Sequence, residues 1–282
     1  MLEPLDVGAA AAGDAAGEGT RERRFGGVAR LFGGAALARM QAAHFVVVGI
    51  GGVGSWTAEA LARSGAGAIT LVDMDHVAES NLNRQVHALE STLGAAKGEA
   101  MRERIAGIWR GCRVTLVDDF VTAENAAGLI PADAIVVDAI DQPRAKAAMI
   151  ALCRRRRQPL VVCGGAGAVT DALGLRRADL ALVRGDPLLA AVRARLRREH
   201  GFPREAGRRF GVAALYFDAQ RVRAVPDAPG AECALPGEEG PEAKPAGRGG
   251  APLACAGYGS LVTVTAALGF AAAGQAIEAA LR

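Results

Sequence analysis

The sequence predicts an α/β protein with a Rossmann-like, mostly parallel sheet, helices on both faces, and a C-terminal extension of strands and helices. Three observations support this prediction. The apolar run at residues 45–48 leads directly into closely spaced glycines, as a buried strand that delivers a tight turn does. Strand-length apolar segments then alternate with helix-length segments as far as residue 163, the order of βαβ units. The 282 residues, 51% of them apolar, suffice for a sizeable core.

The glycine-rich segment at residues 49–54 carries the first functional signal. Gly49, Gly51 and Gly54 fit the pattern G-x-G-x-x-G, in which the missing Cβ atoms permit a tight turn and a close approach to phosphate. The helix expected over residues 55–63 would direct its N-terminal amides and dipole at that anion. Asp73 ends the next apolar run, residues 68–72, at a position where an acid accepts ribose hydroxyls. These features predict a bound nucleotide without specifying which one.

The polar loop that follows, residues 74–85, favours ATP over a nicotinamide dinucleotide. A pyrophosphate bears about two charges, for which glycine amides and a helix N-terminus commonly suffice. ATP bears about four, and phosphates beyond the first usually require cationic side chains. Arg84 and Lys97 fit those roles, with Asn81 as a neutral hydrogen-bonding partner. On spacing alone, the alternative is that Arg84 caps a helix and Lys97 is a solvated surface residue.

Two aspartates at the end of a later strand extend the predicted site. Open parallel sheets bind ligands at the carboxyl ends of their strands, so Asp138 and Asp141 should overlook the glycine turn. Asp141 suits a hydrated magnesium ion, which takes one or two carboxylates plus substrate phosphates. It also suits the start of the next helix, as a cap. The remaining expected elements are helices over 95–108, 122–129 and 142–157, and strands over 113–117, 133–138 and 159–163.

Composition divides the chain into three parts. We expect a disordered tail over residues 1–20 and an ATP-binding domain over 21–180 that begins with short helices. Residues 181–282 continue the same domain, with a strand pair or extended arm over 213–225 and a flexible loop over 226–252. The uncharged run at 261–277 predicts a buried or dimer-interface helix, and the alternative is a membrane span.

Positive charge is concentrated locally. The net charge is only +3, from 33 basic and 30 acidic residues, so nucleic-acid affinity would need a local patch. The stretch 193–209 is the candidate for contact with a nucleic-acid backbone, and a solvated helix face is the alternative. The four arginines at 154–157 are explained by a helix C-terminus, where the dipole favours cations.

The five cysteines argue against a disulfide framework and against a zinc ribbon. Their number is odd, and none are spaced as C-x-x-C. This pattern fits a protein of the reducing cytoplasm. Cys233 and Cys255 are the candidates for a reactive thiol in the late part of the chain, although a buried small hydrophobe is the commoner role of a lone cysteine.

Taken together, the motifs resemble those of the ubiquitin-activating-enzyme-like superfamily, and more narrowly of its tRNA threonylcarbamoyladenosine dehydratase branch. The similarity covers residues 21–225 and 253–282. The residues that carry it are Arg24-Phe25-Gly26-Gly27, Gly49-Ile50-Gly51-Gly52-Val53-Gly54-Ser55-Trp56, Asp73-Met74-Asp75, Asn83-Arg84-Gln85, Asp138-Ala139-Ile140-Asp141 and Gly164-Gly165-Ala166-Gly167.

The resemblance implies an ATP-dependent, adenylate-forming, ligase-like cyclase. ATP would convert the carboxylate of a threonyl group, on a modified adenosine beside the tRNA anticodon, into an acyl-adenylate. The substrate's own carbamoyl nitrogen would then close a ring with net loss of water. The cofactors implied are ATP and Mg²⁺, with a monovalent cation as a further candidate. Among relatives, an arginine ahead of the first strand reaches the other subunit of a homodimer, and here that would be Arg30 or Arg24.

Carried onto this chain, the resemblance assigns each candidate residue a role. The catalytic residues would be Arg84, Lys97 and Asp141, with Asp141 also the magnesium ligand. The nucleotide-binding residues would be Gly49, Gly51, Gly52, Gly54, Asp73, Asp75, Asn81, Arg84, Lys97, Asp138 and Arg30.

Three other functions remain open at this stage. One is an adenylyltransferase that activates the C-terminus of a ubiquitin-like sulfur-carrier protein, with a cysteine desulfurase or sulfur acceptor as partner. Another is a nucleotide-holding adaptor, which would need neither Arg84, Lys97 nor Asp141. The last is a nicotinamide oxidoreductase, for which the sequence offers no hydride-transfer motif.

Overall fold

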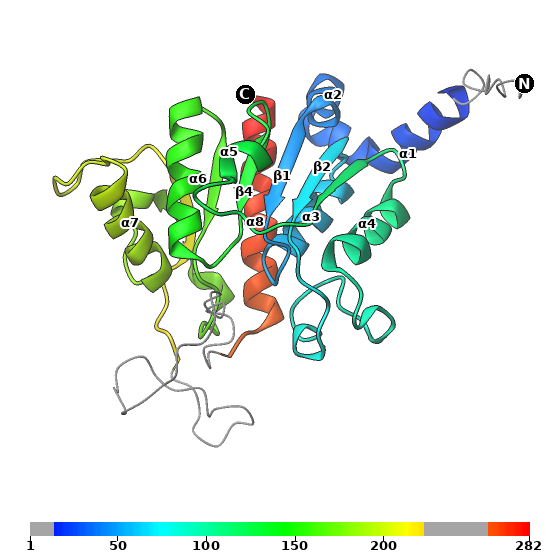
Figure 1. Cartoon of the computed structure of the whole chain (residues 1–282). Helices are drawn as coiled ribbons and strands as arrows, with labels where there is room; N and C mark the ends of the chain where they lie inside the picture. Colours follow the sequence, from blue (N-terminus) through cyan, green and yellow to red (C-terminus); the bar gives the residue numbers. More distant parts are fainter. Residues whose placement is uncertain (1–13, 223–258) are drawn as a thin grey trace, which may run out of the picture.

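The computed structural model describes residues 14–222 and 259–282, and within them a seven-stranded sheet forms the centre of the molecule (Figure 1). The strand order is β3-β2-β1-β4-β5-β7-β6, and every neighbouring pair is parallel except β6 and β7. The mostly parallel sheet predicted from the sequence is therefore confirmed. The strands are β1 (His44–Val48), β2 (Ala68–Val72), β3 (Arg113–Val117), β4 (Ile135–Asp138), β5 (Leu160–Cys163), β6 (Leu175–Asp179) and β7 (Ala213–Phe217).

Eight α-helices are described around this sheet. They are α1 (Asp14–Phe32), α2 (Gly34–Ala42), α3 (Gly54–Arg63), α4 (Lys97–Ile108), α5 (Ala126–Leu129), α6 (Pro143–Arg156), α7 (Pro187–Glu199) and α8 (Val262–Leu281). Short 3₁₀ turns lie at Glu79–Asn81, Glu90–Thr92, Ala172–Gly174 and Leu180–Leu182.

The central strand β1 is buried on both faces of the sheet, which explains its unbroken run of apolar residues. Phe45 and Val47 belong to the core cluster that includes residues of α3 and α8. Val46 and Val48 belong to the cluster that includes residues of α5 and α6. Because successive side chains of a strand point to opposite faces, both faces of β1 are covered.

The order of the strands reverses at β1, which locates the ligand-binding edge. β1 pairs with β2 on one side and with β4 on the other, so Val48 lies between Val72 and Asp138. In open α/β sheets, ligands bind beyond the carboxyl ends of the strands at this switch point. The glycines of residues 49–54 follow β1 at that edge.

Helix α8 is a core helix, as predicted for the apolar run at 261–277. Val264, Leu268, Ala272 and Ala276 are buried in the core cluster, and Thr57 Oγ1 of α3 donates a hydrogen bond to Gly269 O at 3.1 Å. By length and hydropathy α8 is also the one described helix that could cross a membrane, and 44% of its apolar window is buried.

Three predicted boundaries differ from the structure by several residues. Residues 14–20, predicted as part of a disordered tail, belong to α1. The helix predicted over 122–129 begins only at Ala126, as α5. The arm predicted over 213–225 contains the strand β7, whose partner β6 comes earlier in the chain. Residues 1–13, the loop predicted over 226–252, Cys233 and Cys255 lie outside the described residues.

Candidate nucleotide-binding site

The glycine turn after β1 requires glycine at two positions. Gly49 has φ of 80°, and a Cβ there would lie 2.8 Å from Ile140 Cγ2. A Cβ on Gly54 would lie 1.8 Å from Gly49 O, because α3 begins directly against the end of the strand. The turn therefore places the N-terminal amides of α3 at the carboxyl edge of the sheet, as an anion-binding site requires.

Asp73 fixes the position of that turn. Its Oδ2 accepts a hydrogen bond from Ile50 N at 2.8 Å, and its Oδ1 accepts one from Asp75 N at 2.9 Å. Burial raises the pKa of Asp73, while the positive charge of Lys97 and the two amide hydrogen bonds act in the opposite direction. Each carboxylate oxygen has further acceptor capacity. The position is thus compatible with the predicted contact to ribose hydroxyls.

Lys97 enters the site from the first position of α4. Its Nζ lies 2.8 Å from Asp75 Oδ2, and its side chain is only 7% exposed, against 47% for Asp75. The backbone pairs as well, since Lys97 N donates to Asp75 O at 2.9 Å. Lys97 is therefore not the solvated surface lysine of the alternative interpretation. The loop after β2 and the start of α4 are joined through these two residues.

Arg84 lies directly against the glycine turn. A Cβ on Gly52 would lie 3.3 Å from both Cγ and Cδ of Arg84, so the aliphatic part of the side chain covers this glycine. Its Nη1 donates to Ser80 O at 2.7 Å and to Asn83 Oδ1 at 3.0 Å, and its carbonyl accepts from Trp56 Nε1 at 2.9 Å. The loop residues Ser80 and Asn83 thereby orient the guanidinium, and Trp56 of α3 holds the backbone of Arg84.

Asn81 shapes the same loop. Its side chain is buried, and its Oδ1 accepts a hydrogen bond from Ala78 N at 3.1 Å. Its carbonyl accepts from the amides of Arg84 and Gln85. Asn81, predicted as a neutral hydrogen-bonding partner of the phosphates, thus has its side-chain oxygen engaged within the loop, while its carbonyl positions Arg84.

Asp138 differs from its predicted role as a nucleotide ligand. Its side chain and that of Lys146 are both 0% exposed, and Lys146 Nζ lies 2.7 Å from Asp138 Oδ1. Burial raises the pKa of Asp138, and the charge of Lys146 opposes this shift. A carboxylate enclosed in this way cannot contact a ligand. Instead, the pair of Asp138 and Lys146 fixes the end of β4, from which the chain turns toward Asp141.

Asp141 follows three residues later and is partly buried. The segment between Asp138 and Asp141 lies against the glycine turn, since Ala139 N donates to Val48 O at 2.9 Å and Ile140 neighbours Gly49. The prediction that this strand end overlooks the glycines therefore agrees with the structure. Among the residues that the structure describes, no group of three or more His, Cys, Asp or Glu side chains forms a ready-made metal site.

A second buried carboxylate, missed by the sequence analysis, orders the glycines after β5. Asp186 Oδ2 accepts from Gly165 N at 2.9 Å, and its Oδ1 accepts from Leu189 N at 2.9 Å at the start of α7. Arg221 Nη2 lies 3.3 Å from Asp186 Oδ2 and donates to Gly165 O at 3.0 Å. The available signal was Asp186-Pro187, an N-cap followed by proline at the first helical position. Lys146, one turn into the helix after Asp138, was missed in the same way.

Arg30 does not reach the glycine turn of its own chain. It is exposed at the end of α1, and its guanidinium lies against Gly26 and Gly27 of the same helix. Within one chain the structure thus separates Arg30 from the other candidates. The prediction that it serves a neighbouring subunit stays a prediction.

The cysteines of the described ranges are not activated nucleophiles. Cys112, Cys153 and Cys163 are buried, and burial raises their pKa values to about 11, 12 and 12. Such thiols remain protonated at neutral pH, whereas thiolate is the reacting form.

A doubly wound sheet, a glycine turn at its switch point, and two oriented cations beside that turn define an α/β nucleotide-binding protein whose site suits several phosphates. A family profile matches residues 26–281, and the chain belongs to the ThiF family.

Two proteins that align with nearly the whole chain indicate the branch of the family to which it is most similar. The chain is 46% identical to the tRNA threonylcarbamoyladenosine dehydratase of Escherichia coli K12, covering 91% of this chain and 92% of that protein. It is 38% identical to the Haemophilus influenzae protein of the same name, covering 93% and 94%. The crystal structure of the E. coli enzyme in complex with ATP superposes with a TM-score of 0.76 at 43% identity, covering 92% and 94%. The molybdopterin-synthase adenylyltransferase of Salmonella typhimurium is 33% identical over only 42% of this chain and 48% of that protein.

Proposed function

We propose that this protein catalyses the ATP-dependent dehydration of threonylcarbamoyladenosine in tRNA. The observation that carries the proposal is the pair of cations, Arg84 and Lys97, fixed beside the glycine turn by their neighbours. Two such charges exceed what a dinucleotide's pyrophosphate requires and suit the phosphates of ATP. The near full-length similarity to two dehydratases, one of them crystallised with ATP, supports the substrate class.

In the proposed reaction the threonyl carboxylate attacks the α-phosphorus of ATP, and pyrophosphate leaves. The carbamoyl nitrogen of the same substrate then attacks the adenylate carbonyl and loses its proton, and AMP departs with one former carboxylate oxygen. The net change in the nucleoside is the loss of one water. Neither step requires a nucleophile from the protein, because the attacking nitrogen is held within the substrate.

The chain's own residues supply position and charge for these steps. The amides of the glycine turn and of α3 bind phosphate, and Asp73 orients the turn and accepts ribose hydroxyls. Arg84 and Lys97 neutralise the charge that develops on the departing pyrophosphate, the kind of electrostatic stabilisation that works best with preorganised groups. Asp138, paired with Lys146, and Asp186, paired with Arg221, act indirectly by fixing the ends of β4 and β5.

Asp141 is the residue that would hold magnesium. Asp141 is partly buried and follows the end of β4 at the carboxyl edge of the sheet, where Ala139 and Ile140 lie against the glycine turn. One carboxylate fits Mg²⁺ because the ion completes its octahedral shell with water and substrate phosphates. When bound, the ion polarises phosphoryl oxygens. Asp141→Asn should lose magnesium-dependent ATP consumption while nucleotide binding, followed by calorimetry, persists; unchanged magnesium dependence would assign Asp141 to helix capping.

Further elements of the proposal concern assembly and location. The protein acts as a homodimer, and Arg30 of each subunit reaches the nucleotide site of the other. It works in the cytoplasm and does not associate stably with a membrane. A monovalent cation and a cysteine desulfurase or other sulfur-transfer partner belong to the same set of proposals. Gel filtration with light scattering tests the dimer first, because the role of Arg30 depends on it.

Activation of a sulfur-carrier protein is the second candidate. The partial similarity to a molybdopterin-synthase adenylyltransferase favours it, although that match covers less than half of either chain. Exchange of labelled pyrophosphate into ATP distinguishes the dehydratase from the sulfur-carrier adenylyltransferase. The exchange reports adenylate formation, and it occurs only when the carboxylate that the enzyme activates is present. Exchange should depend on tRNA that carries threonylcarbamoyladenosine. Exchange that depends on a carrier protein with a glycine C-terminus, and not on tRNA, would exclude the dehydratase function.

A further inference from the structure

Two arginine runs that are distant in the sequence meet at one edge of the protein. Helix α6 ends in the first run, residues 154–157, directly before β5. Helix α7 starts beside Gly165, at the carboxyl end of β5, and ends in the second run ahead of β7. The two helices pack together through Ile150, Leu189 and Val192 among others. Both therefore end at the edge where the strands begin, opposite the glycine turn.

A direct contact joins the two runs. The guanidinium of Arg154 lies 3.2 Å from the position that a Cβ on Gly211 would take, and Gly211 follows Arg208 and Arg209 by three and two residues. Arg156 is used structurally, since it donates to Ile130 O and Ala127 O. We call the exposed arginines of both runs the arginine surface: Arg154, Arg155, Arg157, Arg198, Arg204, Arg208 and Arg209.

The net positive charge around the arginine surface is large compared with that of the whole chain. Residues 193–209 alone carry seven arginines and two glutamates, a net of +5, whereas the whole chain has a net charge of +3. Within the described ranges no carboxylate forms an ion pair with Arg155, Arg204 or Arg209. A helix dipole accounts for cations in the last turn of a helix. It does not account for Arg204 and Arg209, which lie beyond α7.

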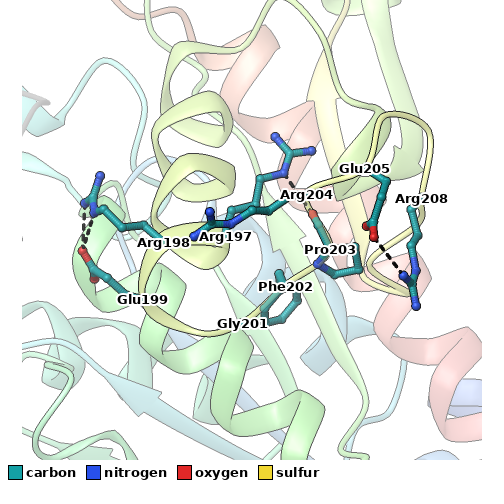
Figure 2. A pocket seen from close by; sticks show the side chains of 9 residues that line it. All are labelled: Arg197, Arg198, Glu199, Gly201, Phe202, Pro203, Arg204, Glu205 and Arg208. Atoms are coloured by element: carbon teal, nitrogen blue, oxygen red, sulfur yellow. Dashed lines mark hydrogen bonds and ion pairs between the residues drawn. The ribbon is translucent and has the colours of Figure 1, made fainter.

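The surface is shaped as well as charged. Next to α7 lies an open hollow of about 490 Å³, with the ion pairs Arg198–Glu199 and Arg208–Glu205 on opposite sides (Figure 2). Arg197 is held over the Phe210 ring at 5.3 Å and donates to Pro203 O at 3.1 Å. Rigid guanidinium groups around a polar hollow suit phosphate oxygens, which guanidinium binds with two parallel hydrogen bonds.

We infer that the arginine surface binds the sugar–phosphate backbone of the substrate tRNA, at a double-stranded segment away from the reacting nucleotide. The inference rests on the proposed function. Helix α6 spans the distance from the nucleotide site to this surface, about 20 Å for its length. A double-stranded segment of the tRNA about 20 Å from the reacting nucleotide would therefore meet the arginines. Contacts of this kind recognise the shape of an RNA helix rather than its base sequence.

The test compares two triple variants with the same change in net charge. Arg155→Gln, Arg204→Gln and Arg209→Gln together remove three charges from the arginine surface. Arg102→Gln, Arg176→Gln and Arg282→Gln remove three exposed charges elsewhere. Binding of tRNA to the full chain is followed by fluorescence anisotropy over a series of salt concentrations, and ATP binding is measured for each variant.

The surface variant should bind tRNA roughly tenfold or more weakly, and its plot of log K against log salt should be shallower by about 3, because fewer counterions are released. The control variant should keep the slope of wild type, and kcat at saturating tRNA should be unchanged in both. Equal behaviour of the two variants would overturn the inference. So would unchanged tRNA binding combined with lost binding to phosphatidylserine vesicles. A wild-type protein that binds tRNA here yet never converts its nucleoside would contradict only the proposed function.

Discussion

Nζ of Lys146 lies 2.7 Å from Oδ1 of Asp138, and neither side chain is exposed to solvent. The lysine also donates to the carbonyl of Asp138 at 3.2 Å, and Ile140 N donates to the same carboxylate at 3.4 Å. This buried pair therefore fixes the end of β4, which in turn positions Ile140 against Gly49. The nucleotide turn and the strand end that carries Asp141 are connected through it.

Removing one member of the Asp138–Lys146 pair should lower the free energy of unfolding. Lys146→Ala leaves the Asp138 carboxylate buried without its cation, and we expect a loss of about 3–5 kcal/mol in the free energy of unfolding. Urea denaturation measures it. The double variant with Asp138→Asn and Lys146→Met should recover much of that loss, because no uncompensated charge remains. A loss below about 1 kcal/mol for Lys146→Ala, the range of an exposed ion pair, would contradict the buried pairing.

The two site cations should matter for the reaction. Arg84→Ala and Lys97→Ala should each lower kcat about 100-fold or more, as expected when a cation that stabilises the transition state is lost. Lys97→Ala should also reduce stability, because Lys97 is buried against Asp75. Arg102→Ala, an exposed residue on the same helix as Lys97, is the matched control and should leave turnover unchanged. Near-normal kcat in both site variants would show that neither side chain faces ATP.

His87 predicts a specific pH dependence of stability. Burial first, and then the nearby positive charges of Lys97 and Arg104, lower the pKa of His87 from 6.5 to about 4. Below pH 6.5 the unfolded chain binds a proton that the folded protein does not bind, so stability falls until about pH 4. The expected loss from this residue between neutral pH and about pH 5 is about 2 kcal/mol.

Chemical denaturation across this pH range provides the check. His87→Gln should flatten the dependence, whereas His76→Gln, at an exposed position, should leave it as in wild type. Identical slopes for wild type and His87→Gln would mean that His87 titrates normally in the folded protein.

The cysteines distinguish intramolecular ring closure from a thioester mechanism. Replacing Cys233 and Cys255 together by Ser should leave dehydration within about tenfold of wild type, because the substrate nitrogen attacks the adenylate directly. Sulfur-carrier activation through a cysteine nucleophile predicts collapse of activity instead. Single-turnover assays with denaturing gels would reveal a trapped thioester, and its presence on either residue would refute ring closure without a protein nucleophile.

Much of the fold could be predicted because its central strands, β1, β2 and β4, are buried on both faces. β2 and β3 begin and end at the predicted residues, and β1, β4 and β5 lie within one or two residues of theirs. β6 was missed because it is an edge strand whose sequence, with Arg176 and Arg177 exposed, lacks an apolar pattern. β6 is recognisable as a strand only from its antiparallel pairing with β7 in the structure.

The site was harder to predict because sequence order does not reveal burial. An aspartate at a strand end looks the same whether it faces a ligand or an interior lysine, and Asp138 faces Lys146. In the same way, Asn81 and Asp75 carry the expected chemistry but use it within the protein, on Ala78 N and Lys97. The contact between Arg154 and Gly211 is a tertiary feature that neither arginine run indicates alone.

The most direct test of the proposed function is nucleoside mass spectrometry of tRNA carrying threonylcarbamoyladenosine after incubation with the protein. With ATP, the modified nucleoside should lose the mass of one water, and one AMP and one pyrophosphate should appear for each nucleoside converted. Without ATP, or with Arg84→Ala, conversion should be absent or at least about 100-fold slower. An unchanged nucleoside mass, with ATP consumed only when a sulfur-carrier protein is present, would contradict the assignment.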